Sequence, residues 1–340
     1  MYNPKILLVF ICSFLLFSCV QKEQEEKIED VVVAVSADSA LVFINEKIKK
    51  NPNDPKLYHE RAKYFLQTNG NIDAALSDMS RLFKLDSSKA EYFVTLSDLY
   101  FTKGLAGNVK AALEKALELE PENIDARMKL AELHLYLKNY KESIGNIDKI
   151  LRIDKYNAKA YFIKGMAFKE SGDTAKAVSS FQTTVEQDPD YYHAYMQLGL
   201  LFATQKNKLA LDYYNNALKV TPNSIEAWYA AGVFCQENNM HKKAIESYFN
   251  ILEIDTEHVY AHYNLGYVHS EYLKEYKTAI DHFSNALSFK PSYYEALYMR
   301  GYCYERLGDF PKALENYDLA LKINPDYYLA YIGKSRVKKN

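Results

Sequence analysis

Residues 296–325 read ALYMRGYCYERLGDFPKALENYDLALKINP, and this stretch decides the fold. Its apolar residues recur three and four positions apart, which is the spacing of one face of an α-helix. The polar pair Gly308 and Asp309 interrupts that spacing midway, and Pro325 closes the stretch. The residue before a proline is pushed out of helical geometry. The stretch therefore predicts a helix, a tight turn and a second helix.

The same unit returns along the chain in three columns of residues. Glycines recur at steps of 34, 33, 34 and 35 residues, alanines recur in parallel with them, and an aromatic residue follows each alanine four positions later. The columns are Gly165, Gly199, Gly232, Gly266 and Gly301; Ala177, Ala210, Ala244, Ala279 and Ala313; and Phe181, Tyr214, Tyr248, Phe283 and Tyr317. Small residues let helices approach closely, because overpacking such a contact costs about 1–3 kcal/mol. The columns predict a linear array of helix pairs.

This pattern resembles the tetratricopeptide repeat, a 34-residue helix–turn–helix unit with Leu-Gly, aromatic, Ala and Pro positions. Residues 227–255, AWYAAGVFCQENNMHKKAIESYFNILEID, match it as well as 296–325 do. The resemblance implies an all-α fold, an α-solenoid wound as a right-handed superhelix, with eight repeats over residues 53–327. Lone helices over 37–52 and 328–340 are expected to cap the array, since such arrays need polar terminal caps.

Tyrosine pairs follow three of the closing prolines. They lie in DPDYYHAY (188–195), KPSYYEALY (290–298) and NPDYYLAY (324–331). Each pair stands where the chain enters the next unit, so we expect an aromatic ring to pack between neighbouring units. Tyrosine suits this place because its ring can be buried while its hydroxyl reaches water. Most of the 30 tyrosines are therefore predicted to be architectural.

The N-terminus differs from the repeats. An apolar run of 12 residues, 6–17, follows Lys5. It is too short to span a bilayer, which needs about 20 residues, but it is typical of a signal peptide. The run ends in LFSC (16–19), which resembles a bacterial lipobox. The resemblance implies a lipoprotein signal peptide over 1–18 and lipidation of Cys19; an ordinary signal peptide is the alternative.

An acidic segment follows the predicted lipidation site. VQKEQEEKIED (20–30) carries a net charge of −3 and has no apolar period. Residues 19–36 are therefore predicted to be a solvated tether. The acidic run also resembles the export signal of Bacteroidetes-type lipoproteins. This resemblance implies a lipid-anchored protein of the cell envelope, attached to the outer membrane and facing either the surface or the periplasm.

No catalytic signature stands out. The sequence lacks the usual nucleotide, metalloprotease and nucleophile-elbow motifs, and a formal charge of −2 argues against nucleic acid as a partner. His258, His262 and His269 lie close together in sequence, but two of them occupy aromatic columns, which favours packing over a metal site. Cys235 and Cys303 lie on apolar faces, so we expect buried thiols and no disulfide. We expect no enzyme, cofactor or metal.

The predicted binding site is a concave groove. In the repeat family that the sequence resembles, first helices line such a groove, and register indicates which residues face it. The alternative is that close winding buries some rings against each other. The expected partner-binding residues are Met128, Phe162, Met166, Met196, Tyr229, Tyr260, Tyr263, Tyr267, Tyr298 and Tyr302, with Glu271, Glu295 and Glu305.

These residues indicate a non-enzymatic interaction scaffold. Tyrosine offers adaptable contact area, and the acidic margin favours a cationic protein or peptide segment. Tyr263 and Tyr298 are the expected hot spots. The alternative is a glycan-binding envelope lipoprotein that uses the same tyrosines, although a single tryptophan, Trp228, argues against it.

Overall fold

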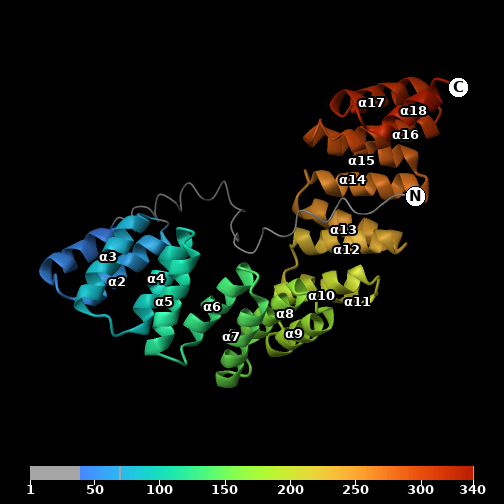
Figure 1. Ribbon diagram of the computed structural model, residues 1–340. Coiled ribbons are helices and arrows are strands. Elements are labelled where there is room, and N and C mark those ends of the chain that lie inside the picture. Colours follow the sequence, from blue (N-terminus) through green and yellow to red (C-terminus); the bar gives the residue numbers. More distant parts are fainter. Residues whose placement is uncertain (1–38, 69, 340) are drawn as a thin grey trace. The chain divides into compact units, whose positions relative to one another are not determined.

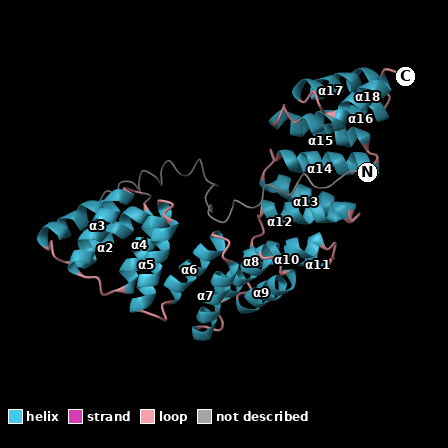
Figure 2. Cartoon of the chain, in the orientation of Figure 1, coloured by secondary structure: helices cyan, strands magenta, loops and turns pink. Residues whose placement is uncertain are grey.

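The computed structural model describes residues 39–68 and 70–339. Throughout these residues the chain forms helices joined by turns, and no strand occurs among them (Figure 2). None of the described helices has the length and apolarity that a membrane crossing requires. The predicted signal peptide, Cys19 and the acidic tether lie outside the described residues.

The described helices follow one another as eight helix–turn–helix repeats, which confirms the predicted all-α solenoid (Figure 1). A helix over residues 39–50 precedes them, and α18 (Tyr328–Val337) follows them. Repeats 1 to 8 are α2 (Pro55–Gln67) with α3 (Ile72–Leu85), α4 (Ala90–Thr102) with α5 (Ala106–Leu119), α6 (Ile124–Tyr136) with α7 (Tyr140–Ile153), α8 (Ala158–Glu170) with α9 (Thr174–Gln187), α10 (Tyr192–Thr204) with α11 (Leu209–Val220), α12 (Ile225–Glu237) with α13 (His241–Ile254), α14 (Val259–Tyr267) with α15 (Tyr276–Phe289), and α16 (Tyr294–Arg306) with α17 (Phe310–Ile323). The described residues divide into two compact units, one up to Leu133 and the other from His134 onward.

The core of repeats 4 to 8 is an aromatic ring packed on a glycine. A Cβ built on Gly199 would lie 2.4 Å from the ring of Tyr214, and one on Gly232 would lie 2.7 Å from the ring of Tyr248. The same contact joins Gly165 to Phe181, Gly266 to Phe283 and Gly301 to Tyr317. In repeats 1 and 2 the small residue is Ala62 or Ser97, and the column that holds the ring contains the smaller Met79 or Leu113. An aromatic ring thus occurs in the repeats where the small residue is glycine, and a smaller side chain occurs where it is alanine or serine.

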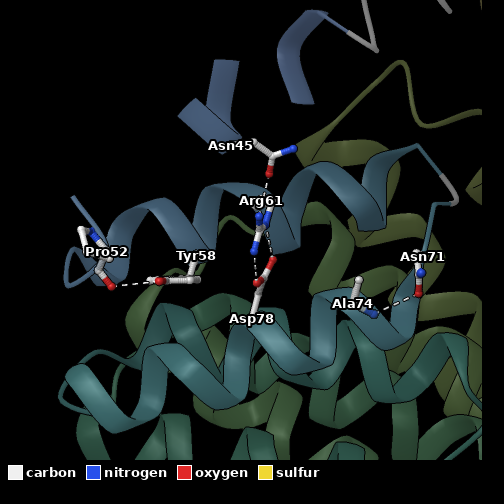
Figure 3. A network of polar contacts seen from close by, with 7 residues as sticks. All are labelled: Asn45, Pro52, Tyr58, Arg61, Asn71, Ala74 and Asp78. Atoms are coloured by element: carbon white, nitrogen blue, oxygen red, sulfur yellow. Dashed lines mark hydrogen bonds and ion pairs between the residues drawn. The ribbon is translucent and has the colours of Figure 1, made fainter. Parts of the chain in front are cut away.

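In several first helices a side chain reaches back six residues to a backbone carbonyl. Tyr58 Oη donates to the carbonyl of Pro52 at 2.9 Å (Figure 3). The same bond runs from Arg127 to Pro121, from Tyr161 to Lys155, from Trp228 to Pro222, and from His262 Nε2 to Thr256. Four different residue types therefore serve one structural purpose, which is to fix the start of the helix on the preceding turn.

In repeats 1 and 8 a polar contact joins the first helix to the second helices on either side of it. Arg61 donates to both carboxylate oxygens of Asp78 at 2.6 and 2.7 Å, and to Asn45 Oδ1 at 2.6 Å (Figure 3). Arg300 bonds Asn316 and Ser284 in the same way. Asn45 belongs to the helix over 39–50, so that helix packs on α2 as the second helix of a preceding repeat would.

The tyrosine pairs pack as the sequence predicts. The first ring of each pair lies on a ring from the preceding repeat: Tyr191 on Phe162, Tyr293 on Tyr263 and Tyr327 on Tyr298, with centroids 5.0, 4.9 and 5.5 Å apart. These rings connect successive repeats. Cys235 and Cys303 are free and buried, which confirms the expected thiols.

Repeat 7 contains one extra residue, which a π-helical turn absorbs. Gly266 to Gly301 spans 35 residues. The turn η1 (Val268–Leu273) extends α14 and ends at Lys274 in the left-handed conformation, with φ of 60°. Single π-turns often occur at functional sites. This one carries Glu271 and Tyr272.

Candidate functional site

The structure corrects part of the predicted groove. Met128, Phe162 and Met166 are each 5% exposed and Met196 is 3% exposed, so these side chains belong to the core. The ring of Phe162 shows why: it lies between Phe181 and Tyr191, with centroids 5.6 and 5.0 Å away. A ring from the next repeat closes over the position that register alone assigns to the groove.

Glu305 is the second correction, because it is not an open rim carboxylate. It forms an ion pair with Arg336 of α18, whose Nη2 donates to Oε2 at 2.8 Å. Tyr317 Oη donates to the same oxygen at 2.7 Å. Burial pushes the Glu305 pKa up, but the bonds from Arg336 and Tyr317 outweigh burial and leave the pKa below its usual value. This carboxylate is already satisfied within the chain.

Tyr263 and Tyr298, the expected hot spots, are half-buried. The ring of Tyr263 contacts Phe283 and Tyr293, with centroids 5.7 and 4.9 Å away. The ring of Tyr298 lies on Tyr317 and Tyr327 in the same way. Both tyrosines therefore contribute to packing, which is the alternative that the sequence leaves open, and their partner-binding role stays a prediction.

Tyr260 is the most exposed of the expected tyrosines, at 46%. Lys290 Nζ lies 5.3 Å from its ring centroid and 4.9 Å from that of Tyr293. Such distances are those of a cation–π contact. The chain thus places its own ammonium group over these two rings.

Open carboxylates remain on the first helices of repeats 6 to 8. Glu237, Glu271 and Glu295 form no ion pair with any described residue. Burial, followed by the charges of Glu271 and Glu237, raises the pKa of Tyr272. Burial and Glu271 raise the pKa of Tyr302. The negative charges of these carboxylates thus act on both phenol groups.

Glu271 lies at the centre of this region, and Glu237, Glu271, Tyr267, Tyr272 and Tyr302 are called the Glu271 cluster below. Tyr267 and Tyr302 are half-buried, and Tyr272 is 39% exposed. The rings of Tyr267 and Tyr272 meet edge to face, with centroids 6.0 Å apart. The cluster offers aromatic surface and negative charge together.

Tyr272 is a functional candidate that the sequence reasoning missed. Its ring stacks on His241, with centroids 4.0 Å apart and an angle of 20° between the planes. It lies in η1, where the extra residue shifts the helical register. The 35-residue step was the signal that could have revealed it.

The rings of His262 and His269 both pack against His282 in repeat 7. His282 lies 5.6 Å from His269 and 5.9 Å from His262 by ring centroid, and His269 Nδ1 bonds Glu275 at 2.7 Å. Over the described residues, no group of three or more His, Cys, Asp or Glu is placed to hold a metal ion.

Comparisons with known proteins agree with this architecture. Tetratricopeptide-repeat family models match residues 90–123, 164–210 and 294–327. The chain is 24% identical to DnaJ homolog subfamily C member 7 of Homo sapiens, over 57% of this chain and 45% of that protein. It is 27% identical to the peroxisomal targeting signal receptor of Candida albicans, over 52% of this chain and 31% of the receptor. The chain thus spans less than half the length of both relatives.

Among solved structures, the chain is similar to the C-terminal part of a TPR repeat-containing protein from Cytophaga hutchinsonii. The TM-score is 0.55 at 21% identity, and the match covers 71% of this chain and 99% of that one. This likeness concerns the fold.

Proposed function

Because the chain is a tetratricopeptide-repeat protein, we propose that it is a non-enzymatic scaffold whose Glu271 cluster binds a cationic segment of another protein. Proteins of this repeat type serve as protein–protein interaction scaffolds. The repeat array supplies several parallel first helices, and the Glu271 cluster supplies the charge and the rings.

A comparison of repeats 7 and 8 carries the proposal. Glu271 and Glu305 both lie 12 residues before the ring of their repeat, which is Phe283 or Tyr317. In repeat 8 the carboxylate accepts the Tyr317 hydroxyl and binds the guanidinium of Arg336. In repeat 7 the ring has no hydroxyl, and the residue 31 positions after the carboxylate is Tyr302, where repeat 8 has Arg336.

The pair in repeat 8 thus shows what repeat 7 can bind. An incoming Arg or Lys could form an ion pair with Glu271, as Arg336 does with Glu305. It would also lie against the rings of Tyr272 and Tyr302. A cation over an aromatic ring contributes about 0.5–2 kcal/mol, and Glu237 adds further charge on the same side. The cluster therefore favours arginine-containing segments.

Binding of short synthetic peptides, measured by fluorescence anisotropy, tests this proposal. One peptide set contains Arg and aromatic residues, and the matched set has Gln at every Arg. The Arg set should bind, and Glu237→Gln with Glu271→Gln should weaken it by about tenfold, which corresponds to about 1.4 kcal/mol. Added salt should weaken it too, because the cluster is partly solvated.

The matched control changes the same charge elsewhere. Glu253 and Glu315 are exposed on second helices, and Gln at both positions should leave binding unchanged. If peptide affinity fell equally in the Glu237/Glu271 and the Glu253/Glu315 double variants, the effect would be one of general charge, and the proposed site would be refuted. Soluble glycans that displaced the peptide would favour the glycan-binding alternative.

We also propose that the mature chain is anchored in the envelope through a lipid on Cys19. The apolar run 6–17 and the LFSC motif support this. Two acyl chains on the cysteine give stable attachment, whereas one chain gives only marginal binding. The acidic segment after Cys19 would then separate the repeats from the membrane.

A further inference from the structure

The face of α18 that points away from α17 is open. Tyr328 is 68% exposed, Tyr331 is 63% exposed and Ile332 is 37% exposed. These residues, with Ser335, are spaced three, four and seven positions from Tyr328, so they form one helical stripe. In repeat 8 the residue equivalent to Tyr331 is Leu297, which is 4% exposed. The open stripe of α18 is therefore the surface that a second helix covers in a complete repeat.

The helix over residues 39–50 has the converse open face. Phe43 is 58% exposed, whereas Asn316, which also lies nine residues before a closing proline, is 3% exposed. Asn316 faces α16: a Cβ on Gly301 would lie 3.1 Å from its Cβ, and Arg300 Nε donates to its Oδ1 at 2.8 Å. Phe43 thus lies on the face that a second helix turns toward its own first helix.

The register of the 39–50 helix is supported by its packing on α2. Asn45 and Asp318 both lie seven residues before a closing proline. Each contacts the residue 16 positions later on the following first helix, Arg61 or Lys334. Among the described residues, the 39–50 helix therefore packs as a second helix with no first helix before it, and α18 packs as a first helix with no second helix after it.

The residues in the two repeat columns also correspond in size. The residue of α18 that is equivalent to Gly301 is Ser335, and the residue of the 39–50 helix that is equivalent to Tyr317 is Ile44, which is itself 5% exposed. In the repeat columns a glycine is combined with an aromatic ring, whereas Ser97 is combined with Leu113. A serine opposite an aliphatic residue follows the same rule.

We propose that helix 39–50 of one copy docks on α18 of a second copy and completes a ninth repeat, so that copies associate head to tail. The two surfaces differ, which makes the contact heterologous. A heterologous contact that does not close into a ring generates open chains of molecules. A single helix against a single helix buries a small area, and interfaces of that size are transient. Association should therefore be weak and should depend on local concentration.

Disulfide trapping between two tagged forms of the full chain tests the proposal. One form carries Phe43→Cys and the other Ser335→Cys, because the equivalent Cβ atoms in repeat 8 would lie 3.1 Å apart. Short Cβ separations of this kind favour disulfide formation. When the two forms are expressed together, oxidation should yield a cross-linked product that carries both tags, and each form alone should give little product.

Two controls make the result decisive. Leu329→Cys is on another side of α18 and, paired with Phe43→Cys, should give at most a tenth of the product. Tyr331→Glu, added to the Ser335→Cys form, should remove the product while circular dichroism stays unchanged. A product that joins two Ser335→Cys forms would show tail-to-tail pairing and overturn the proposal, as would the absence of any product in folded variants.

Discussion

The contact between Gly199 and Tyr214 gives the sharpest test of the repeat packing. A Cβ at position 199 would lie 2.4 and 2.6 Å from two ring atoms of Tyr214, far inside normal contact distance. The ring cannot move away easily, because it is 1% exposed and packed among Met196, Ala217 and Ala231. Gly199→Ala should therefore force α10 and α11 apart.

The expected free-energy change combines two opposing effects. Overpacking a core costs about 1–3 kcal/mol, and this contact is the closest of the five glycine–ring pairs. Alanine is favoured over glycine inside a helix by about 1 kcal/mol. Gly199→Ala should thus destabilise the protein by about 2 kcal/mol. Gly145 in α7 has nothing within 4 Å of a built Cβ, so Gly145→Ala should stabilise it by about 0.5–1 kcal/mol.

Urea unfolding followed by far-UV circular dichroism measures both changes. The unfolding curves are fitted with a model that couples neighbouring repeats, because a solenoid does not unfold as one unit. Tyr214→Leu supplies the second arm of a double-mutant cycle. Repeats 1 and 2 combine Ala62 or Ser97 with Met79 or Leu113, so alanine and leucine together should fit in the double variant. We expect a favourable coupling of about 1–2 kcal/mol. Strictly additive effects, or a Gly199→Ala variant as stable as Gly145→Ala, would refute the reasoning.

Three further predictions concern single groups. Burial, together with the charges of His269 and His262, lowers the pKa of His282 to about 4. As the pH falls, the unfolded chain therefore binds a proton at this histidine before the folded chain does, so the free energy of unfolding should be highest above pH 6.5 and should fall by about 1–2 kcal/mol toward pH 4. This value is smaller than the full pKa shift implies, because the ring is partly solvated. His282→Phe should flatten this part of a pH series of melting curves, and an unchanged pH profile would contradict it. Arg336→Met should leave Glu305 unpaired, and hydrogen exchange should then show α18 opening at least tenfold faster with α16 unaffected. Cys19→Ala should abolish metabolic labelling with palmitate, and persistent labelling would disprove the anchor.

The repeat array could be predicted from sequence because its columns record direct contacts. Gly199, Gly232 and Gly266 recur since a ring occupies the place of a Cβ at each of them. The prolines and tyrosine pairs mark the turn and the ring that joins one repeat to the next. These contacts are local, so the period alone specifies them.

The exposure of the predicted groove residues could not be predicted from the period in the same way. Register assigns Phe162 and Tyr263 to the same face of their helices, but exposure depends on which residues close over that face. Tyr191 covers Phe162, and Tyr293 covers one side of Tyr263. The covering ring comes from the next repeat, so a helix considered alone does not reveal it. The position of Tyr272 could not be predicted from the regular period for a related reason, because the π-turn changes the helical register locally.

A comparison of the ring column with the residues 12 positions before it would have distinguished Glu271, which forms no ion pair with any described residue, from Glu305, which pairs with Arg336. In repeats 6 and 8 the residue 12 positions before the ring accepts a hydrogen bond from the tyrosine hydroxyl: Gln236 accepts from Tyr248 at 3.0 Å and Glu305 from Tyr317 at 2.7 Å. In repeat 4 the ring is Phe181, which has no hydroxyl, and Lys169, 12 residues before it, donates to Gln197 Oε1. Phe283 likewise leaves Glu271 without a donor in its own repeat, and the first helix that follows offers Tyr302 where α18 offers Arg336 to Glu305. The combination of Phe283 in the ring column with a carboxylate 12 residues before it leaves Glu271 without such a hydrogen bond, and this is the physical reason for proposing a binding site in repeat 7.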